Sequence, residues 1–365
     1  MWEKIKSILV IALSALMVGG FFVACLLKSP DEISLSERRP LAQFPEVDAR
    51  EVASGKFMKD FEKYAADQFP FRETFRKIYR DVSLKLLGQS DLEGLCIYGD
   101  MAVAQEYPVN EQSLDYAIQV FQRIYETCLK EQGSDVYLAV VPDKNYFLSD
   151  ISDLSMDYDH FFERMRKGLP QMTYLDLAPL LELSDYYRTD PHWRQEDLVD
   201  VAKYLAGEMG APLTSPFEKQ EVNELFYGSY WGQTAGALPG EKMYYLTNEV
   251  MEGCQVYDHQ NDCPMEMYDL SKVGGRDPYE LYLSGSLSYI TIENPKAAED
   301  KELIIFRDSF GSAIAPLLVE GYGKITLLDI RYLPSYALKN QVDFHGQDVL
   351  FLYSTSVLNH SETIK

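Results

Sequence analysis

The feature that most constrains this chain is an uncharged apolar run near its N-terminus, "SILVIALSALMVGGFFVACLL" at residues 7–27. In an α-helix these 21 residues would rise roughly 30 Å, about the thickness of the hydrocarbon core of a bilayer. A cleaved signal peptide normally has a shorter apolar region followed by small residues at its cleavage site, and no such site stands out here. The run therefore predicts an uncleaved membrane anchor over residues 1–28, with a cleaved signal as the alternative.

The charges beside this run predict its orientation. Lys4 and Lys6 precede the run, which favours a cytoplasmic N-terminus. The polar residues 29–56, which contain three prolines, predict an extended stalk. A single-pass protein of the cell membrane is thus expected, with residues 57–365 folded outside the cytoplasm.

The overall charge excludes one class of partner. The chain has 34 basic and 57 acidic residues, a net charge of −23. Binding to nucleic acid is not expected, because neutralising phosphates requires a basic surface.

Cysteine and histidine spacing gives little support for a metal site. Cys254 and Cys263 flank a short polar loop and could form a disulfide outside the cell. With His259 between them they could instead be metal ligands, but a fourth ligand is missing. Free thiols are the third alternative. The five histidines are scattered through the chain, so we predict neither a metal nor a cofactor.

Short apolar segments alternating with helical patterns predict the fold class. Four of these segments are "VYLAVV" from residue 136, "LIIF" from 303, "KITLLDI" from 324 and "DVLFLY" from 348. Such an alternation is typical of an α/β fold with a parallel sheet flanked by helices. Residues 222–294 are rich in tyrosine and glycine and show no long helical pattern, so they predict an antiparallel β insertion.

Asp190 and His192 are separated by one proline in "YYRTDPHW", residues 186–193. Pro191 disfavours helix at Asp190, and in an extended segment side chains two residues apart point to the same side. The carboxylate could then orient the imidazole as a general base. The alternative is an Asp-Pro turn that carries a surface histidine.

Ser309 is the candidate nucleophile. It follows the apolar segment "LIIFRD" and precedes a helical pattern, so it falls at a strand-to-helix corner, where open α/β sheets bind ligands. The free N–H groups of the helix could stabilise an oxyanion there. Alternatively Asp308 or Ser309 only caps the helix. Ser312 is a weaker candidate, because it falls inside the first turn.

These two stretches resemble a known family. "TDPHW" is similar to the Asp-x-His-Trp signature of the DHHW family and of the related alginate O-acetyltransferase-like proteins of the AlgX and AlgJ type. Two positions depart from the family pattern: Pro191 replaces the usual His or Thr, and Arg38 replaces an asparagine. The resemblance extends over about residues 36–355 through segments in the family's order, namely "SERRPLAQFPE", "FMKDFEKYAADQFPFRETF", "VVPDKNYF", "FYGSYWGQTAG", "FRDSFGSAIAPLL" and "LDIRYL" with "DVLFLY".

The resemblance implies an SGNH-hydrolase-like domain with a catalytic triad. Ser309 would accept the acyl group, His192 would be the base and Asp190 would orient it. Trp193 would pack behind the pair or line a sugar groove. Substrate-binding roles are predicted for Lys144, Trp193, Tyr230, Arg307 and Arg331, and for Lys144, Tyr230 and Arg331 the alternative is a structural contact.

The resemblance also implies a function. We expect a serine-dependent O-acetyltransferase or acetylesterase that acts on a cell-surface polysaccharide. A membrane-bound O-acyltransferase would supply the acetyl group. Transferase and esterase share the same acyl-enzyme, so the sequence leaves that choice open. The alternative is a non-catalytic, membrane-tethered protein that binds or assembles glycans. A metal-dependent hydrolase has little support, because the five scattered histidines do not have the spacing of metal ligands.

Overall fold

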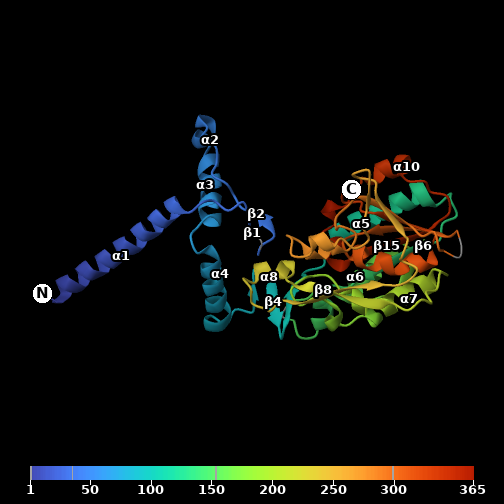
Figure 1. The fold of residues 1–365 in the computed structure, drawn as a ribbon, viewed down its shortest axis with the longest axis horizontal. Helices are drawn as coiled ribbons and strands as arrows, with labels where there is room; N and C mark the ends of the chain where they lie inside the picture. Colours follow the sequence, from blue (N-terminus) through green and yellow to red (C-terminus); the bar gives the residue numbers. More distant parts are fainter. Residues whose placement is uncertain (1, 35, 153, 298–299) are drawn as a thin grey trace. The chain divides into compact units, whose positions relative to one another are not determined.

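The computed structural model describes residues 2–34, 36–152, 154–297 and 300–365 (Figure 1). The chain divides into two compact parts. We call residues 1–92 with 231–237 the N-terminal unit, and residues 93–230 with 238–365 the sheet unit. A domain boundary at residue 57 stays a prediction.

The N-terminal unit begins with helix α1 (Trp2–Leu27). Its stretch Lys4–Leu27 is long and apolar enough to cross a membrane. Residues 29–56, predicted as a stalk, contain the hairpin of β1 (Ile33–Ser34) and β2 (Arg39–Pro40) and the short helix α2 (Ala49–Ser54). The unit continues with α3 (Lys56–Asp67), α4 (Arg72–Asp81), the π-helical turn η1 (Val82–Leu86) and β3 (Asp91–Leu92).

A parallel arrangement of five strands forms the centre of the sheet unit. They lie in the order β14-β13-β15-β6-β7. Their bounds are β6 (Val136–Val141), β7 (Thr173–Leu175), β13 (Glu302–Arg307), β14 (Lys324–Leu328) and β15 (Asp348–Ser354). Ile305 pairs with Leu350 on β15 and with Leu327 on β14. The predicted α/β class with a mainly parallel sheet is confirmed.

Antiparallel strands supply the insertion. Strands β12 (Tyr289–Glu293), β10 (Gln255–Asp258) and β11 (Cys263–Met265) extend the same sheet beyond β14, while β8 (Glu218–Phe226) and β9 (Glu241–Thr247) form a separate pair. The only α-helix described between 222 and 294 is the five-residue α8 (Ser229–Gln233). The antiparallel prediction therefore holds, although three of these five strands belong to the main sheet.

The expected disulfide is not formed, because the register of the strands keeps its cysteines apart. Cys254 and Cys263 are both free, and Cys263 pairs with Asp258 at the far end of β10. Four residues of strand separate Asp258 from Cys254, about 13 Å at 3.3 Å per residue. A disulfide tolerates a Cα separation of no more than about 7 Å.

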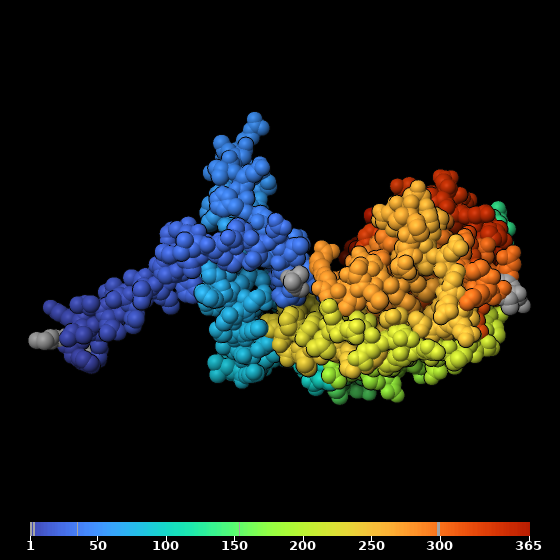
Figure 2. All heavy atoms as spheres, in the orientation of Figure 1, coloured from blue at the N-terminus to red at the C-terminus, as the bar shows by residue number. Residues whose placement is uncertain are grey.

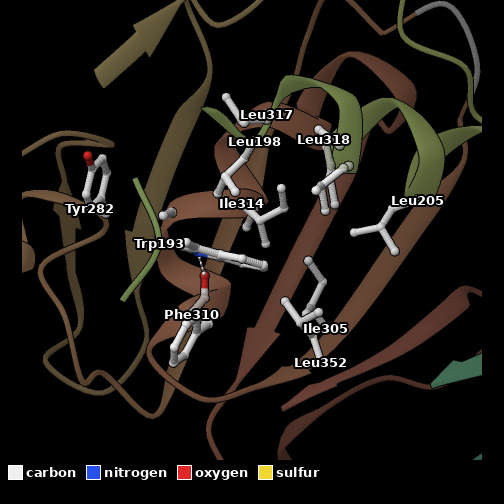
Figure 3. Close-up of a cluster of buried hydrophobic side chains, with 14 of the residues drawn as sticks. Trp193, Leu198, Leu205, Tyr282, Ile305, Phe310, Ile314, Leu317, Leu318 and Leu352 are labelled. Atoms are coloured by element: carbon white, nitrogen blue, oxygen red, sulfur yellow. Dashed lines mark hydrogen bonds between the residues drawn. The ribbon is translucent and has the colours of Figure 1, made fainter. Parts of the chain in front are cut away.

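Helices cover both faces of the sheet, so alternate residues of each strand enter different cores. Ile305 and Leu352 pack with α7 (Val199–Glu208) and α9 (Phe310–Ile314), as Figure 3 shows. Phe306 and Phe351 pack with α5 (Glu111–Ile124) and α6 (Tyr158–Gly168). The remaining strands and α-helices are β4 (Leu95–Tyr98), β5 (Met101–Ala104), α10 (Leu338–Gln341) and α11 (Thr355–Asn359).

The second of these cores predicts a large effect of truncation at Phe351. Its buried ring stacks on Phe306 with centroids 4.6 Å apart and lies 4.8 Å from Phe121. Phe351→Ala should lower the free energy of unfolding by about 3–5 kcal/mol in guanidinium titrations of the full chain in detergent. Tyr336→Ala, at a side chain that is 84% exposed, should change it by less than about 0.5 kcal/mol. Equal losses for both variants would contradict this core.

Candidate active site

Asp190, His192 and Ser309 form one chain of hydrogen bonds. Nδ1 of His192 lies 2.5 Å from Oδ1 of Asp190, and Nε2 lies 2.7 Å from Oγ of Ser309. Bonding of Nδ1 to a carboxylate favours the tautomer with its proton on Nδ1 and an accepting lone pair on Nε2. The imidazole is therefore placed to take the Ser309 proton.

A turn, rather than the expected extended segment, brings Asp190 and His192 together. Tyr186 and Trp193 pair antiparallel, and the backbone N–H of Tyr187 donates to the carbonyl of His192 at 3.0 Å. Within this closed loop the His192 N–H donates to Oδ1 of Asp190 at 3.2 Å. Local bonding of this kind is typical of aspartate in turns. Pro191, between the two, therefore does not prevent the carboxylate from reaching the ring.

Three successive backbone N–H groups clamp the loop from the other side. The N–H of Ser229 donates to Oδ2 of Asp190, and those of Gly228 and Tyr230 donate to Oγ1 and the carbonyl of Thr189, each at 2.8 Å. A Cβ on Gly228 would lie 2.2 Å from the Thr189 carbonyl oxygen and 2.4 Å from Cβ of Asp190. Only glycine permits this approach.

Two aromatic rings hold the imidazole. The ring of Tyr279 stacks on His192 with centroids 3.9 Å apart and planes 10° apart, and Phe310 lies 4.9 Å away. Tyr279 comes from the 3₁₀ turn Pro278–Leu281, which Asp277 caps through the N–H of Tyr279. The stacked Tyr279 ring limits the rotation of the imidazole.

The nucleophile candidate does not cap its helix. Oδ1 of Asp308 accepts the N–H of Phe310 at 3.0 Å, while Oδ2 accepts the N–H and Oγ of Ser354 at 2.8 and 2.7 Å. Ser309 makes no capping bond, so its half-buried hydroxyl is left to His192. Among the described residues its backbone N–H has no hydrogen-bond partner either.

Trp193 supports the site from behind. It is completely buried among residues that include Leu198, Ile305 and Ile314, and its Nε1 donates to the carbonyl of Phe310 at 3.2 Å (Figure 3). Two positions are predicted for Trp193, behind the Asp190–His192 pair or in a sugar groove. In the structure the Trp193 side chain lies behind the pair and is not exposed to solvent.

The two arginines bind protein groups. Arg307 is fully buried, and its Nη2 donates to the carbonyls of Gly285 and Leu287 at 3.1 and 3.2 Å. Arg331 grips Asp329 with Nε and Nη2 at 2.9 and 2.6 Å. Both therefore brace loops in this structure, and their substrate contacts stay predictions.

Lys144 and Tyr230 lie together. Nζ of Lys144 is 5.3 Å from the centroid of the Tyr230 ring and donates to the carbonyl of Ala102 at 2.7 Å. Burial lowers the pKa of Lys144 to about 7, and the nearby Asp190 carboxylate partly opposes this shift. Their substrate roles also stay predictions.

Sequence reasoning missed Gly228, Ser229 and Tyr279 as parts of the site. The segment "FYGSYWG" contains a signal for the first two, but the family resemblance assigns a role in it only to Tyr230. Tyr279 gave no local signal, because its role depends on a contact across 87 positions of the chain. Within the described residues, no group of three or more His, Cys, Asp or Glu side chains could hold a metal ion.

Comparison with known proteins supports the fold. The chain matches no family model and no curated protein. Its fold resembles the solved structure of Bacillus cereus PatB1, with 19% identity, 72% of this chain and 96% of that chain covered, and a TM-score of 0.58. PatB1 with a sulfonyl adduct aligns with a TM-score of 0.57, also at 19% identity, over 72% of this chain and 95% of that chain.

A DHHW family protein from Eubacterium siraeum matches with 19% identity, 74% of this chain and 93% of that chain covered, and a TM-score of 0.55. Such identities establish a shared fold. The suspected resemblance to the DHHW family is thus supported at the level of the fold.

Gly228→Ala tests the clamp on Asp190. The added methyl group must displace the Thr189–Asp190 backbone, so the orientation of His192 is lost. The rate at which a phenylmethylsulfonyl fluoride probe labels Ser309, followed by intact mass, should fall on the order of tenfold or more. Gly207→Ala, at a helical position with open space around its Cβ, is the matched control. Unchanged labelling of the Gly228 variant would refute the clamp.

Lys144 should make stability depend on pH. Its pKa of about 7 in the folded chain lies below the value of about 10.5 expected in the unfolded chain. Between these values the unfolded chain binds more protons, so the free energy of unfolding rises with pH, by up to about 1.4 kcal/mol per pH unit. Below about pH 7 Lys144 is protonated in both the folded and the unfolded chain, so its contribution to the free energy of unfolding no longer changes with pH. Lys144→Met should remove the slope between pH 7 and 9, whereas the exposed control Lys339→Met should retain it. Equal slopes in both variants would contradict the assignment.

Proposed function

We propose that this protein is a membrane-anchored, serine-dependent O-acetyltransferase or acetylesterase that acts outside the cytoplasm on a cell-surface polysaccharide. The observation that carries the proposal is the hydrogen-bonded series Asp190–His192–Ser309, with the serine hydroxyl released from helix capping. The family resemblance is the reason for proposing acetyl as the transferred group and a glycan as the substrate. The apolar helix α1 supplies the anchor.

In the proposed first half-reaction, Oγ of Ser309 attacks the acetyl carbonyl while Nε2 of His192 accepts the hydroxyl proton. Asp190, which is only 1% exposed, keeps Nδ1–H oriented and stabilises the imidazolium that forms. The N–H of Ser309, which has no hydrogen-bond partner among the described residues, can donate to the developing oxyanion. Collapse of the tetrahedral intermediate breaks the bond to the leaving oxygen, which takes the proton from Nε2.

In the second half-reaction, a hydroxyl group attacks acetyl-Ser309. His192 removes the proton of the attacking hydroxyl and returns it to Oγ of Ser309 as the acetyl bond breaks. A sugar hydroxyl yields an O-acetylated glycan, and water yields acetate. A membrane-bound O-acyltransferase is the proposed source of the acetyl group in the transfer reaction.

The non-catalytic alternative rests on Pro191. A scaffold protein has no need for a serine held within hydrogen-bond distance of an oriented imidazole. The turn accommodates the proline and leaves the Asp190–His192 bond at 2.5 Å. This geometry supports the enzyme over a glycan-binding scaffold.

The test is formation of an acetyl-enzyme by the full chain in detergent with p-nitrophenyl acetate. Wild type should gain one acetyl group on Ser309 by intact mass and peptide mapping. Ser309→Ala should lose adduct and turnover by on the order of a thousandfold or more. Ser312→Ala is the matched control, because this nearby serine is buried and its Oγ has no partner among the described residues. Acetylation that persists in the Ser309 variant, or its absence from wild type, would reject the enzyme.

A further inference from the structure

Helix α4 and the turn η1 are amphipathic, but their charged face is turned toward protein and their apolar face is exposed. We define the arginine stripe as Arg72, Arg76 and Arg80, and the apolar stripe as Phe71, Phe75, Ile78, Tyr79, Val82 and Leu86. Both sets follow helical spacing. In a helix of a soluble protein the apolar stripe normally faces the core and the charged face meets water.

The arginine stripe faces protein. Arg72 and Arg76 reach the carboxylate of Glu37 at 2.6 and 3.5 Å, and Arg80 donates to the carbonyl of Ala235 at 2.8 Å. Arg76 also donates to the carbonyl of Gly232 at 2.5 Å. These arginine side chains are only 16–20% exposed.

The apolar stripe faces outward. Its residues are 38–76% exposed, and the side chains of this segment lie on the surface of the N-terminal unit (Figure 2). The stripe extends over about 22 Å of helix from Phe71 to Leu86. A continuous exposed apolar face of this length indicates an apolar covering.

Contacts with the membrane helix identify what covers it. Phe21, which lies six residues inside the end of α1, stacks on Phe69 at 5.4 Å and lies 5.7 Å from Phe75 of the stripe. Six residues of helix correspond to a depth of about 9 Å. If α1 spans the bilayer, Phe75 therefore lies at the depth of the lipid headgroups and the first acyl carbons, where interfacial helices bury their apolar faces.

The distribution of charge between the two units agrees with a position of α4 at the membrane surface. The N-terminal unit carries 14 basic and 13 acidic residues, a net charge of +1, whereas the sheet unit carries 20 basic and 44 acidic residues, a net charge of −24. Lys77 and Lys85 flank the apolar stripe and are exposed. The excess of acidic residues thus belongs to the sheet unit and not to the unit that contains α1.

We infer that α4 and η1 form an interfacial helix whose apolar stripe is embedded in the outer surface of the lipid bilayer beside α1. The arginine stripe meanwhile binds Glu37 and the segment 231–237. This inference rests on the proposed anchor and is independent of the proposed chemistry. Two attachments, one spanning and one interfacial, would fix the orientation of the N-terminal unit at the membrane.

The test uses the full chain in phosphatidylcholine nanodiscs that contain a phosphatidylcholine with a diazirine in its acyl chain. After illumination, adducts are mapped by mass spectrometry. Peptides with the apolar stripe should carry adducts on the order of tenfold above the peptide with Tyr336, an 84% exposed aromatic residue of the sheet unit. Peptides from α1 should also be labelled.

Two variants sharpen the result. Ile78→Asp with Leu86→Asp changes side chains that are 52% and 76% exposed, so folding should be retained, and labelling of the stripe should fall severalfold while that of α1 stays unchanged. The control, Lys77→Asp with Lys85→Asp, should leave Phe75 labelled.

Labelling of α1 with the stripe at the level of Tyr336 would overturn the inference while the anchor stands, and would point to a protein partner on this face. If neither α1 nor the apolar stripe is labelled, both the proposed anchor and the interfacial helix are overturned. Failure of acetyl-enzyme formation would leave this result untouched.

Discussion

The buried carboxylate of Asp190 is the interaction on which the rest of the site depends. Burial of an unpaired charge is costly, so this group requires donors on every side. Oδ1 receives the ring and backbone N–H groups of His192, and Oδ2 receives the N–H of Ser229. One side chain thereby ties the 186–193 turn to the end of β8 and sets the position of the base.

The sheet supplies the other half of the geometry. Strand β13 ends where Asp308 binds Ser354 at the end of β15, so two neighbouring parallel strands position the corner. Asp308 takes over helix capping, and Ser309 is left for the imidazole. His192 is in turn held by Tyr279 from the segment before β12. Three distant parts of the chain thus meet at one imidazole.

The elements with strong local patterns could be predicted from the sequence. The apolar runs at β6, β13 and β15, and Ser309 at the corner after β13, follow from strand periodicity and from the edge at which parallel strands end. The sequence predicts an Asp190–His192 pair joined through extended backbone, whereas the structure joins these two residues through an Asx-type turn.

What escaped prediction depends on tertiary approach. Gly228 matters because another backbone passes within 2.2 Å of where its Cβ would lie, and no local pattern encodes that distance. The disulfide expectation failed because strand register, invisible in the spacing, offsets Cys254 from Cys263. Periodicity likewise identifies the helix at Arg72–Asp81, but it does not reveal that the arginines face protein and Phe75 faces outward.

The most direct test of the central claim is the tautomer of His192 in the resting protein. In the full chain with ¹⁵N-labelled histidine, NMR of the neutral His192 ring should show a strongly downfield proton on Nδ1 and no proton on Nε2, and Asp190→Asn should abolish this signal. A His192 ring protonated on Nε2 alone, or a spectrum unchanged by Asp190→Asn, would contradict the claim that the buried carboxylate orients the base.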